Sequence, residues 1–178
     1  ATTTGYMLFK RFNRSISKTS PGVASQNRPS IIFRLADFYL IYAEVANEVN
    51  PSDSRVLTYL NLVRERAGLP KVEILNPGIV GNKELQRAAI QRERQIELAT
   101  EGQRYFDVRR WMIADKDGEG RQNGYAHGMN VRGTINDTEE FNRVVETEKI
   151  VFNRKMYLQP IPDHEMRKTQ NLVQNPGW

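Results

Sequence analysis

Residues 93–111 read ERQIELATEGQRYFDVRRW, the most densely patterned stretch of the chain. Glu93, Glu97 and Glu101 lie four positions apart, so a continuous helix would place them along one face. Gly102 interrupts the run, and a second group of charged residues follows it. The pattern predicts a helix from about residue 82 to residue 100, a bend, and a short helix over residues 104–112.

The three glutamates need cations, because like charges at this spacing repel one another. Arginine suits this role, since its planar guanidinium grips a carboxylate with two hydrogen bonds. Arg104, Arg109 and Arg110 follow the bend, and we expect them to fold back and supply the positive charge.

Paired carboxylates also perform acid–base chemistry in glycosidases, where they face each other across a cleft and one has a raised pKa. Here every acid in the stretch has arginines nearby, and an adjacent guanidinium keeps a carboxyl group ionised. We therefore favour structural ion pairs over a catalytic site.

Upstream, residues 34–49 show a helical spacing of apolar residues. The stripe consists of Leu35, Phe38, Tyr39, Tyr42, Ala46 and Val49. We expect this face to be the buried one, with Leu35, Tyr42 and Ile96 packed against each other. Asn50-Pro51 ends the helix, because proline disfavours a helical residue before it.

A second helix is expected after Ser52, which offers an N-cap, and before Gly68, a residue typical just past a helix end. The short link between the two helices predicts an antiparallel helix hairpin. Residues 70–82 read as a loop, with Asn82 as the N-cap of the third helix. A final helical turn is expected from Asp163 to Met166.

Residues 115–145 have no clear period and predict a long irregular segment, the kind of loop that often carries function. Short extended pieces are expected at residues 6–9, 151–152 and 157–158. The fold class is therefore mainly α, with helix hairpins and long irregular loops. No period of about 34 residues marks a tetratricopeptide array.

Composition excludes several classes of protein. The chain has 178 residues, 39% of them hydrophobic, which allows one core but no membrane-spanning segment. It has no cysteine, so disulfides and thiolate metal sites are excluded, and two histidines make no metal site. Net charge is +5, yet Lys and Arg alternate with Glu and Asp. This mixture favours solvated helix faces and ion pairs over nucleic-acid binding.

Residues 93–111 resemble the ER-x-x-EL-x-x-EG-x-R-x-x-D-x-x-RW signature of the SusD/RagB family. Further segments resemble the family's motifs in the expected order: RLADFYLIYAE at 34–44, NLVRERAGLP at 61–70, and YLQPIPDHE at 157–165 with the terminal QNPGW at 174–178. Asp37 stands where the family usually has Glu, and Trp178 occupies the slot of the terminal aromatic residue. Residues 113–155 match no family motif.

The resemblance implies a non-enzymatic receptor that binds glycans, or sometimes peptides, without a cofactor. Such proteins are lipid-anchored on the outer face of the outer membrane in Bacteroidetes and cap a SusC-like TonB-dependent transporter. They are mostly helical, with tetratricopeptide-like helix pairs, and are much longer than 178 residues. We therefore expect residues 31–178 to be the C-terminal helical domain, with 1–30 as a lead-in. The N-terminal part and the lipid-bearing cysteine would lie outside this sequence.

The shared motifs are interpreted as scaffold. Their residues are Arg34, Glu44, Glu93, Glu97, Glu101, Arg104, Asp107, Arg110 and Trp111, with Trp111 expected in the core. Candidates for sugar binding come from the long loop, since aromatic rings stack on sugars and polar side chains bind hydroxyl groups. They are Tyr125, Asn123 and Arg132. For Tyr125, packing beneath the loop is an alternative.

Two other functions stay open. One is a helical protein-interaction scaffold without a small ligand of its own, which the helix hairpin suggests. The other is an enzyme such as a glycoside hydrolase, which only the carboxylates suggest. The resemblance favours glycan binding over both.

Overall fold

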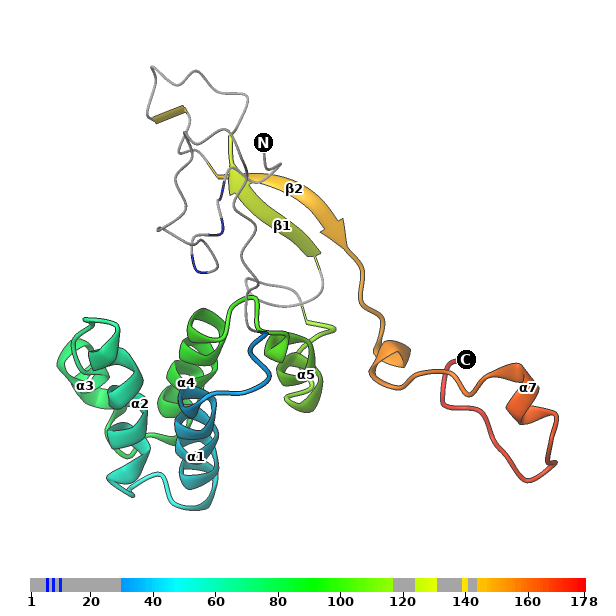
Figure 1. Ribbon diagram of the computed structural model, residues 1–178, viewed down its shortest axis with the longest axis horizontal. Helices are drawn as coiled ribbons and strands as arrows, with labels where there is room; N and C mark the ends of the chain where they lie inside the picture. Colours follow the sequence, from blue (N-terminus) through cyan, green and yellow to red (C-terminus); the bar gives the residue numbers. More distant parts are fainter. Residues whose placement is uncertain are drawn as a thin grey trace. The chain divides into compact units, whose positions relative to one another are not determined.

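The computed structural model is mainly helical, which confirms the predicted fold class (Figure 1). It describes Tyr6, Leu8, Lys10 and residues 30–116, 124–130, 139–140 and 144–178; for residues 124–126 and 144–148 it describes only the backbone. The contacts divide the chain into a helical unit, residues 28–107, and a second unit formed by residues 1–27 and 108–178.

The helical unit is built on α1 (Leu35–Val49), α2 (Arg55–Arg66) and α4 (Lys83–Glu97), which lie side by side (Figure 1). Its apolar core takes residues at helical spacing from each helix: Ala36, Leu40 and Ala43 from α1, Val56, Leu60 and Val63 from α2, and Ile90 from α4. The inward face of α4 is otherwise polar, with Gln86, Glu93 and Arg94 buried. Hydrogen bonds and ion pairs therefore position α4.

The predicted helix hairpin is present, but α2 begins at Arg55 rather than just after Ser52. The backbone N–H of Ser52 donates to Asn50 Oδ1 (3.1 Å), so the link forms its own turn. The Asp53 carboxylate then accepts a hydrogen bond from the Arg55 backbone N–H (2.9 Å). Asp53 thus takes the place predicted for Ser52, because a charged carboxylate is a stronger acceptor than a hydroxyl group. Gly68 has a φ of +77°, as expected of a residue just past a helix end.

Residues 70–82 are more ordered than the predicted loop. They contain the one-turn helix α3 (Val72–Leu75) and the 3₁₀ helix η1 (Pro77–Ile79). The Asn61 side chain explains the first of these, because its Oδ1 accepts from the Val72 N–H (3.0 Å). Its Nδ2 donates to Glu73 (2.8 Å), so a residue of α2 organises the start of this turn. The helix α3 therefore depends on a tertiary contact, which the spacing of residues within 70–82 does not reveal.

The expected start of α4 is confirmed, since Asn82 Oδ1 accepts from the Leu85 N–H (3.2 Å). The helix ends at Glu97, earlier than residue 100, and Thr100 has a φ of +68°. The next helix, α5 (Gln103–Arg110), is also shorter than the predicted span, since Met112 has a φ of +54°. Left-handed backbone at these two positions interrupts helical hydrogen bonding.

The predicted buried face of α1 is wrong. Leu35 and Ile96 are 62% and 57% exposed, and Tyr42 is exposed as well, so these three residues do not form a core cluster. The buried face of α1 instead carries Ala36, Leu40, Ala43 and Asn47. Since α1 has apolar residues on two sides, periodicity alone identified one stripe but could not decide which faces the core.

The second unit contains an antiparallel pair, β1 (Gly124–Met129) and β2 (Val144–Ile150), with an irregular register between Tyr125 and His127 (Figure 1). This pair corrects the expectation of an irregular segment over 115–145. The β1–β2 pair is stabilised by hydrogen bonds between segments that are distant in the sequence. The sequence of β1 does not indicate a strand by itself, because Gly and His interrupt the alternation of apolar residues. The strand predicted at 6–9 lies mostly outside the described residues, and Tyr6 and Leu8 are not in a strand.

A small core cluster in this unit joins Val108, Ala114 and Phe152. Phe152 packs edge-on against Tyr157, whose hydroxyl group donates to Asp115 Oδ1 (2.5 Å). Burial and this hydrogen bond raise the pKa of Tyr157, and the same bond lowers the pKa of Asp115. Tyr157 closes the 3₁₀ helix η2 (Arg154–Tyr157), where a short extended piece was expected.

The C-terminal segment folds back on the residues before α7 (Asp163–Met166), the predicted final turn. Gln174 exchanges two hydrogen bonds with the backbone of Ile161 (2.8 and 2.9 Å), and Asn175 donates to the Gln159 carbonyl (2.6 Å). The Trp178 indole N–H donates to the carbonyls of Lys155 and Leu158 (3.0 Å each). The motifs at 157–165 and 174–178 are therefore direct partners.

Candidate functional site

The glutamates of the 93–111 motif bind arginines from α2 and from the residue just before α1. Arg34, which precedes α1, lies between Glu97 and Glu101. Its guanidinium grips Glu101 with two hydrogen bonds (2.8 and 2.9 Å) and also contacts the Glu97 carboxylate and the Glu97 carbonyl (2.5 and 2.6 Å). The hydrogen bond to Glu101 is the main cause of the raised pKa of Arg34. One side chain therefore fixes the end of α4 to the start of α1.

Helix α2 supplies further cations. Arg66 contacts Glu97 (2.6 Å), and Arg64 contacts the buried Glu93 (2.8 Å). Arg64 also donates from Nε to the carbonyl of Pro70 (3.0 Å), which holds the chain as it leaves α2. The 61–70 and 93–111 motifs are thus joined through their charged residues.

A fully buried triad lies deeper in the helical unit. Arg94 donates to Asp37 Oδ1 (2.9 Å) and grips Asp107 through Nε and Nη2 (2.9 and 3.1 Å). Arg94 and Asp107 are each 2% exposed, so the pairs are shielded from water. The triad joins α1, α4 and α5, and removal of one member would leave a buried charge without compensation.

This arrangement braces the helices through their charged side chains. Each of the five acids named above accepts a hydrogen bond from an arginine. The constellation therefore holds elements of the helical unit together.

The structure places the remaining motif residues as follows. Glu44 is half-buried on α1, Arg104 is half-buried on α5, and Arg110 lies over the ring of Trp111, 4.6 Å from its centroid. Trp111 was expected in the core, but it is only partly buried, because it lies just past the end of α5. The expectation that Arg104, Arg109 and Arg110 supply cations stays a prediction, and the ion pairs described above bring in Arg34, Arg64, Arg66 and Arg94.

Sequence reasoning thus missed Asp37, Arg64, Arg66 and Arg94 as members of the site. All four lie within the quoted motifs, so the signal was present in the spacing of charges. It could not be used, because the pairs join residues 13 to 67 positions apart.

The three candidate sugar contacts are described only in part. Asn123 and Arg132 lie outside the described residues, and Tyr125 is described as a backbone position on β1, paired with Lys149 of β2. His127 is exposed on the same strand. The pairing of Tyr125 with Lys149 places this position in the sheet, next to the register irregularity between Tyr125 and His127.

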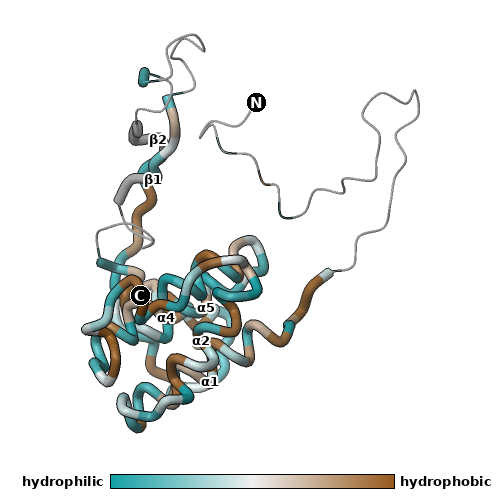
Figure 2. Tube along the Cα trace, turned by 90° about the vertical axis from the view of Figure 1, so that its left-hand side faces the viewer, coloured by the Kyte–Doolittle hydropathy of each residue, from teal (hydrophilic) through white to brown (hydrophobic). Residues whose placement is uncertain are grey.

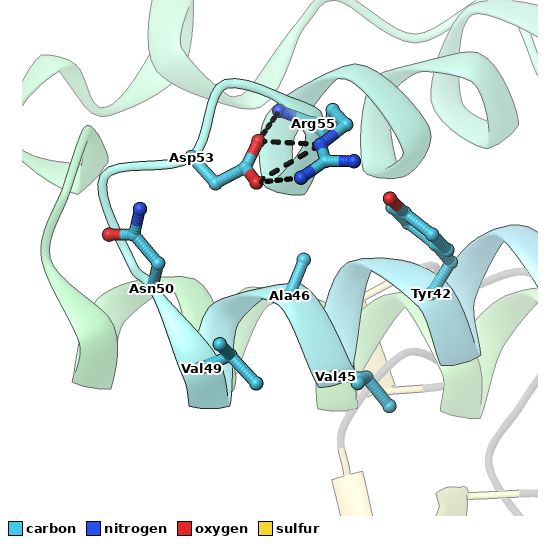
Figure 3. A pocket seen from close by; sticks show the side chains of 7 residues that line it. All are labelled: Tyr42, Val45, Ala46, Val49, Asn50, Asp53 and Arg55. Atoms are coloured by element: carbon cyan, nitrogen blue, oxygen red, sulfur yellow. Dashed lines mark hydrogen bonds and ion pairs between the residues drawn. The ribbon is translucent and has the colours of Figure 1, made fainter.

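A small hollow of about 200 Å³ lies where α1 meets the turn to α2 (Figure 3). The residues that line it are Tyr42, Val45, Ala46 and Val49 of α1, Asn50 and Asp53 of the turn, and Arg55 at the start of α2. Asp53 and Arg55 are paired with each other (2.6 Å), so the charges beside the hollow are already compensated. Its remaining lining is mostly apolar.

Comparison with known proteins identifies the family. The sequence matches the SusD family over residues 1–178. This chain belongs to the SusD family. The SusD-like protein P2 of Formosa agariphila is 31% identical over 153 residues, which cover 83% of this chain and 26% of that protein. The SusD-like protein P25 of the same organism is 44% identical over 89 residues, covering 50% of this chain and 16% of that protein.

Solved structures of SusD-like proteins share the fold. BT4246 is 34% identical, with a TM-score of 0.68 over 86% of this chain and 24% of its own. A SusD-like protein from Bacteroides fragilis is 30% identical, with a TM-score of 0.66 over 84% of this chain and 26% of its own. The chain thus spans about a quarter of the length of these SusD-family structures.

Proteins of the SusD family are generally binding proteins for nutrient uptake, directed at glycans and located at the surface of the outer membrane. In the part of this chain that the structure describes, none of the helices has the length and apolar character of a membrane span. The ion pairs described above join residues of the 34–44, 61–70 and 93–111 motifs.

Proposed function

We propose that this chain is the helical C-terminal part of a longer SusD-family receptor that binds a glycan at the cell surface without hydrolysing it. Family membership over the whole chain carries the proposal. The receptor would be lipid-anchored on the outer face of the outer membrane. It would deliver its ligand to a SusC-like TonB-dependent transporter.

The arginine-held carboxylates support binding without catalysis. In the helical unit, Glu93, Glu97 and Glu101 each accept hydrogen bonds from a guanidinium. Hydrolysis of a glycosidic bond needs one carboxyl group that is protonated near neutral pH and faces the leaving oxygen. We therefore expect Glu97→Gln to lower the melting temperature of the protein, with no hydrolytic activity to lose.

For the ligand contacts we propose Tyr125, with Asn123 and Arg132 as weaker candidates. An aromatic ring can stack on the apolar face of a sugar, while amide and guanidinium groups bind hydroxyl groups. The position of Tyr125 on a paired strand supports this choice, because sites built on strands are held more precisely than sites on loops.

The test uses the full-length protein in calorimetry or affinity electrophoresis against a panel of polysaccharides and peptides. We expect saturable binding of at least one glycan and no release of reducing ends. Tyr125→Ala should weaken that binding, whereas His127→Ala, on the same strand, should not. Equal effects of both substitutions would exclude Tyr125 as a specific contact, and failure of every glycan would count against the proposal.

A helical protein-interaction scaffold without a small ligand is the second candidate, supported by the hairpin of α1 and α2. Co-purification from native membranes separates the two. Capture of a TonB-dependent transporter together with glycan affinity fits the receptor. Capture of the transporter by a protein that binds no glycan fits the scaffold.

A further inference from the structure

Helix α1 carries an exposed apolar stripe on the side opposite the core. We define the α1 stripe as Leu35, Phe38, Tyr42, Val45 and Val49, which are spaced alternately three and four residues apart. Leu35, Phe38, Val45 and Val49 each leave more than half of their surface exposed, and Tyr42 is 39% exposed. At about 100° per residue, this stripe lies nearly opposite the buried Ala36, Leu40 and Ala43.

Two opposite apolar faces are unusual for a helix at a protein surface. A surface helix has one apolar stripe and one polar face, whereas a helix that is apolar on all sides is buried. Ile31, Ile32 and Phe33 extend the exposed apolar surface toward the chain entering α1, a stretch that is brown in Figure 2. Contiguous apolar surface of this kind marks an interface.

The shape and chemistry of the stripe suit another helix. Alternate steps of three and four residues are the spacing by which two helices pack at a shallow crossing angle. The hollow beside Tyr42, Ala46 and Val49 (about 200 Å³) can receive an apolar side chain from such a neighbour (Figure 3). Four of the five side chains in the stripe, all except Tyr42, offer a sugar no hydrogen-bond partner for its hydroxyl groups.

The length of the relatives points to the source of the helix. This chain covers 24% and 26% of two SusD-like structures with the same fold, so three quarters of each lies outside the matched region. We propose that the α1 stripe is a helix–helix interface inside the longer polypeptide, and that its occupant is an amphipathic helix from outside these 178 residues. This inference does not depend on which ligand the receptor binds.

Hydroxyl-radical footprinting of the full-length protein tests the occupant directly. If a helix of the same polypeptide covers the stripe, Phe38 and Tyr42 lose most of their reactivity at every protein concentration, including in the monomer. Protection that appears only as the protein dimerises would assign the stripe to a second copy and overturn the proposal. Protection that requires added glycan, or none at all, would overturn it equally.

Substitution provides an independent readout in the same protein. Val45→Glu should lower the melting temperature by several degrees, because it buries a charge in the interface. Ile74→Glu is the matched control, since Ile74 is an exposed apolar residue on α3, outside the stripe. An equally small shift for both variants contradicts the proposal, and footprinting still decides the matter if Val45→Glu fails to fold.

Discussion

At the scale of the residue, Arg94 shows how a polar side chain can be essential to a helical core. It lies within a helix bundle, 2% exposed, and its guanidinium satisfies two aspartates that are also buried. Such a triad gains little over an apolar core of the same volume, since desolvation offsets most of the attraction. What it adds is specificity, because only one arrangement of α1, α4 and α5 brings the three charges together.

Arg94→Met should destabilise the helical unit by about 3–5 kcal/mol, because it removes the guanidinium that binds the buried Asp37 and Asp107. Urea denaturation followed by circular dichroism measures the loss.

The control for this substitution is Arg87→Met on the same helix. Arg87 pairs with Glu48 and Glu84 at the surface, where an ion pair is worth about 0–1 kcal/mol. If the two variants unfold at the same urea concentration, the triad is not the brace described here.

At the scale of the element, the helix boundaries follow local rules where local groups satisfy the backbone. Asn82 caps α4 as its sequence position indicates, and Gly68 adopts the left-handed conformation just past α2. Where a side chain from elsewhere intervenes, local rules fail. Asn61 of α2 organises α3, and for that reason the span 70–82 is not the loop that its composition suggests.

Asn82→Ala should cost about 1 kcal/mol of stability, because it removes the acceptor for the Leu85 N–H at the start of α4. Thermal denaturation monitored at 222 nm measures this change.

Ser52→Ala and Ser54→Ala provide the comparison. Serine is a preferred cap, but α2 begins without a side-chain cap from Ser54, and Asp53 accepts the hydrogen bond instead. Both variants should therefore stay within about 0.5 kcal/mol of the parent protein. A loss for Ser52→Ala as large as that for Asn82→Ala would restore Ser52 as the cap.

At the scale of the whole molecule, the contacts fall into two units, each held by its own motifs. The helical unit is held by ion pairs among side chains within the span 34–107. The second unit is held by hydrogen bonds between the C-terminal segment and residues 155–161. The family's motifs are therefore of two kinds. Charged motifs join helices, and amide and indole groups fasten the chain end.

Trp178→Leu should speed amide hydrogen exchange over residues 155–175 while exchange in α1, α2 and α4 stays unchanged. The substitution removes the indole N–H that donates to Lys155 and Leu158, together with the ring beneath the Lys155 ammonium group. Hydrogen exchange with mass spectrometry measures both regions in one experiment. Faster exchange in α1, α2 and α4 would show that the two units unfold together.

The sequence alone determined the order of α1, α2, α4 and α5, the helix ends at Val49 and Arg66, and the membership of the family, since each of these depends on neighbouring residues. Only the tertiary structure decided which arginine holds which glutamate, and which side of α1 faces the core. The physical reason is distance along the chain: Arg34 and Glu101 are 67 positions apart, and no local period records their contact. Likewise, only the packing of α2 and α4 shows which apolar side of α1 faces the core.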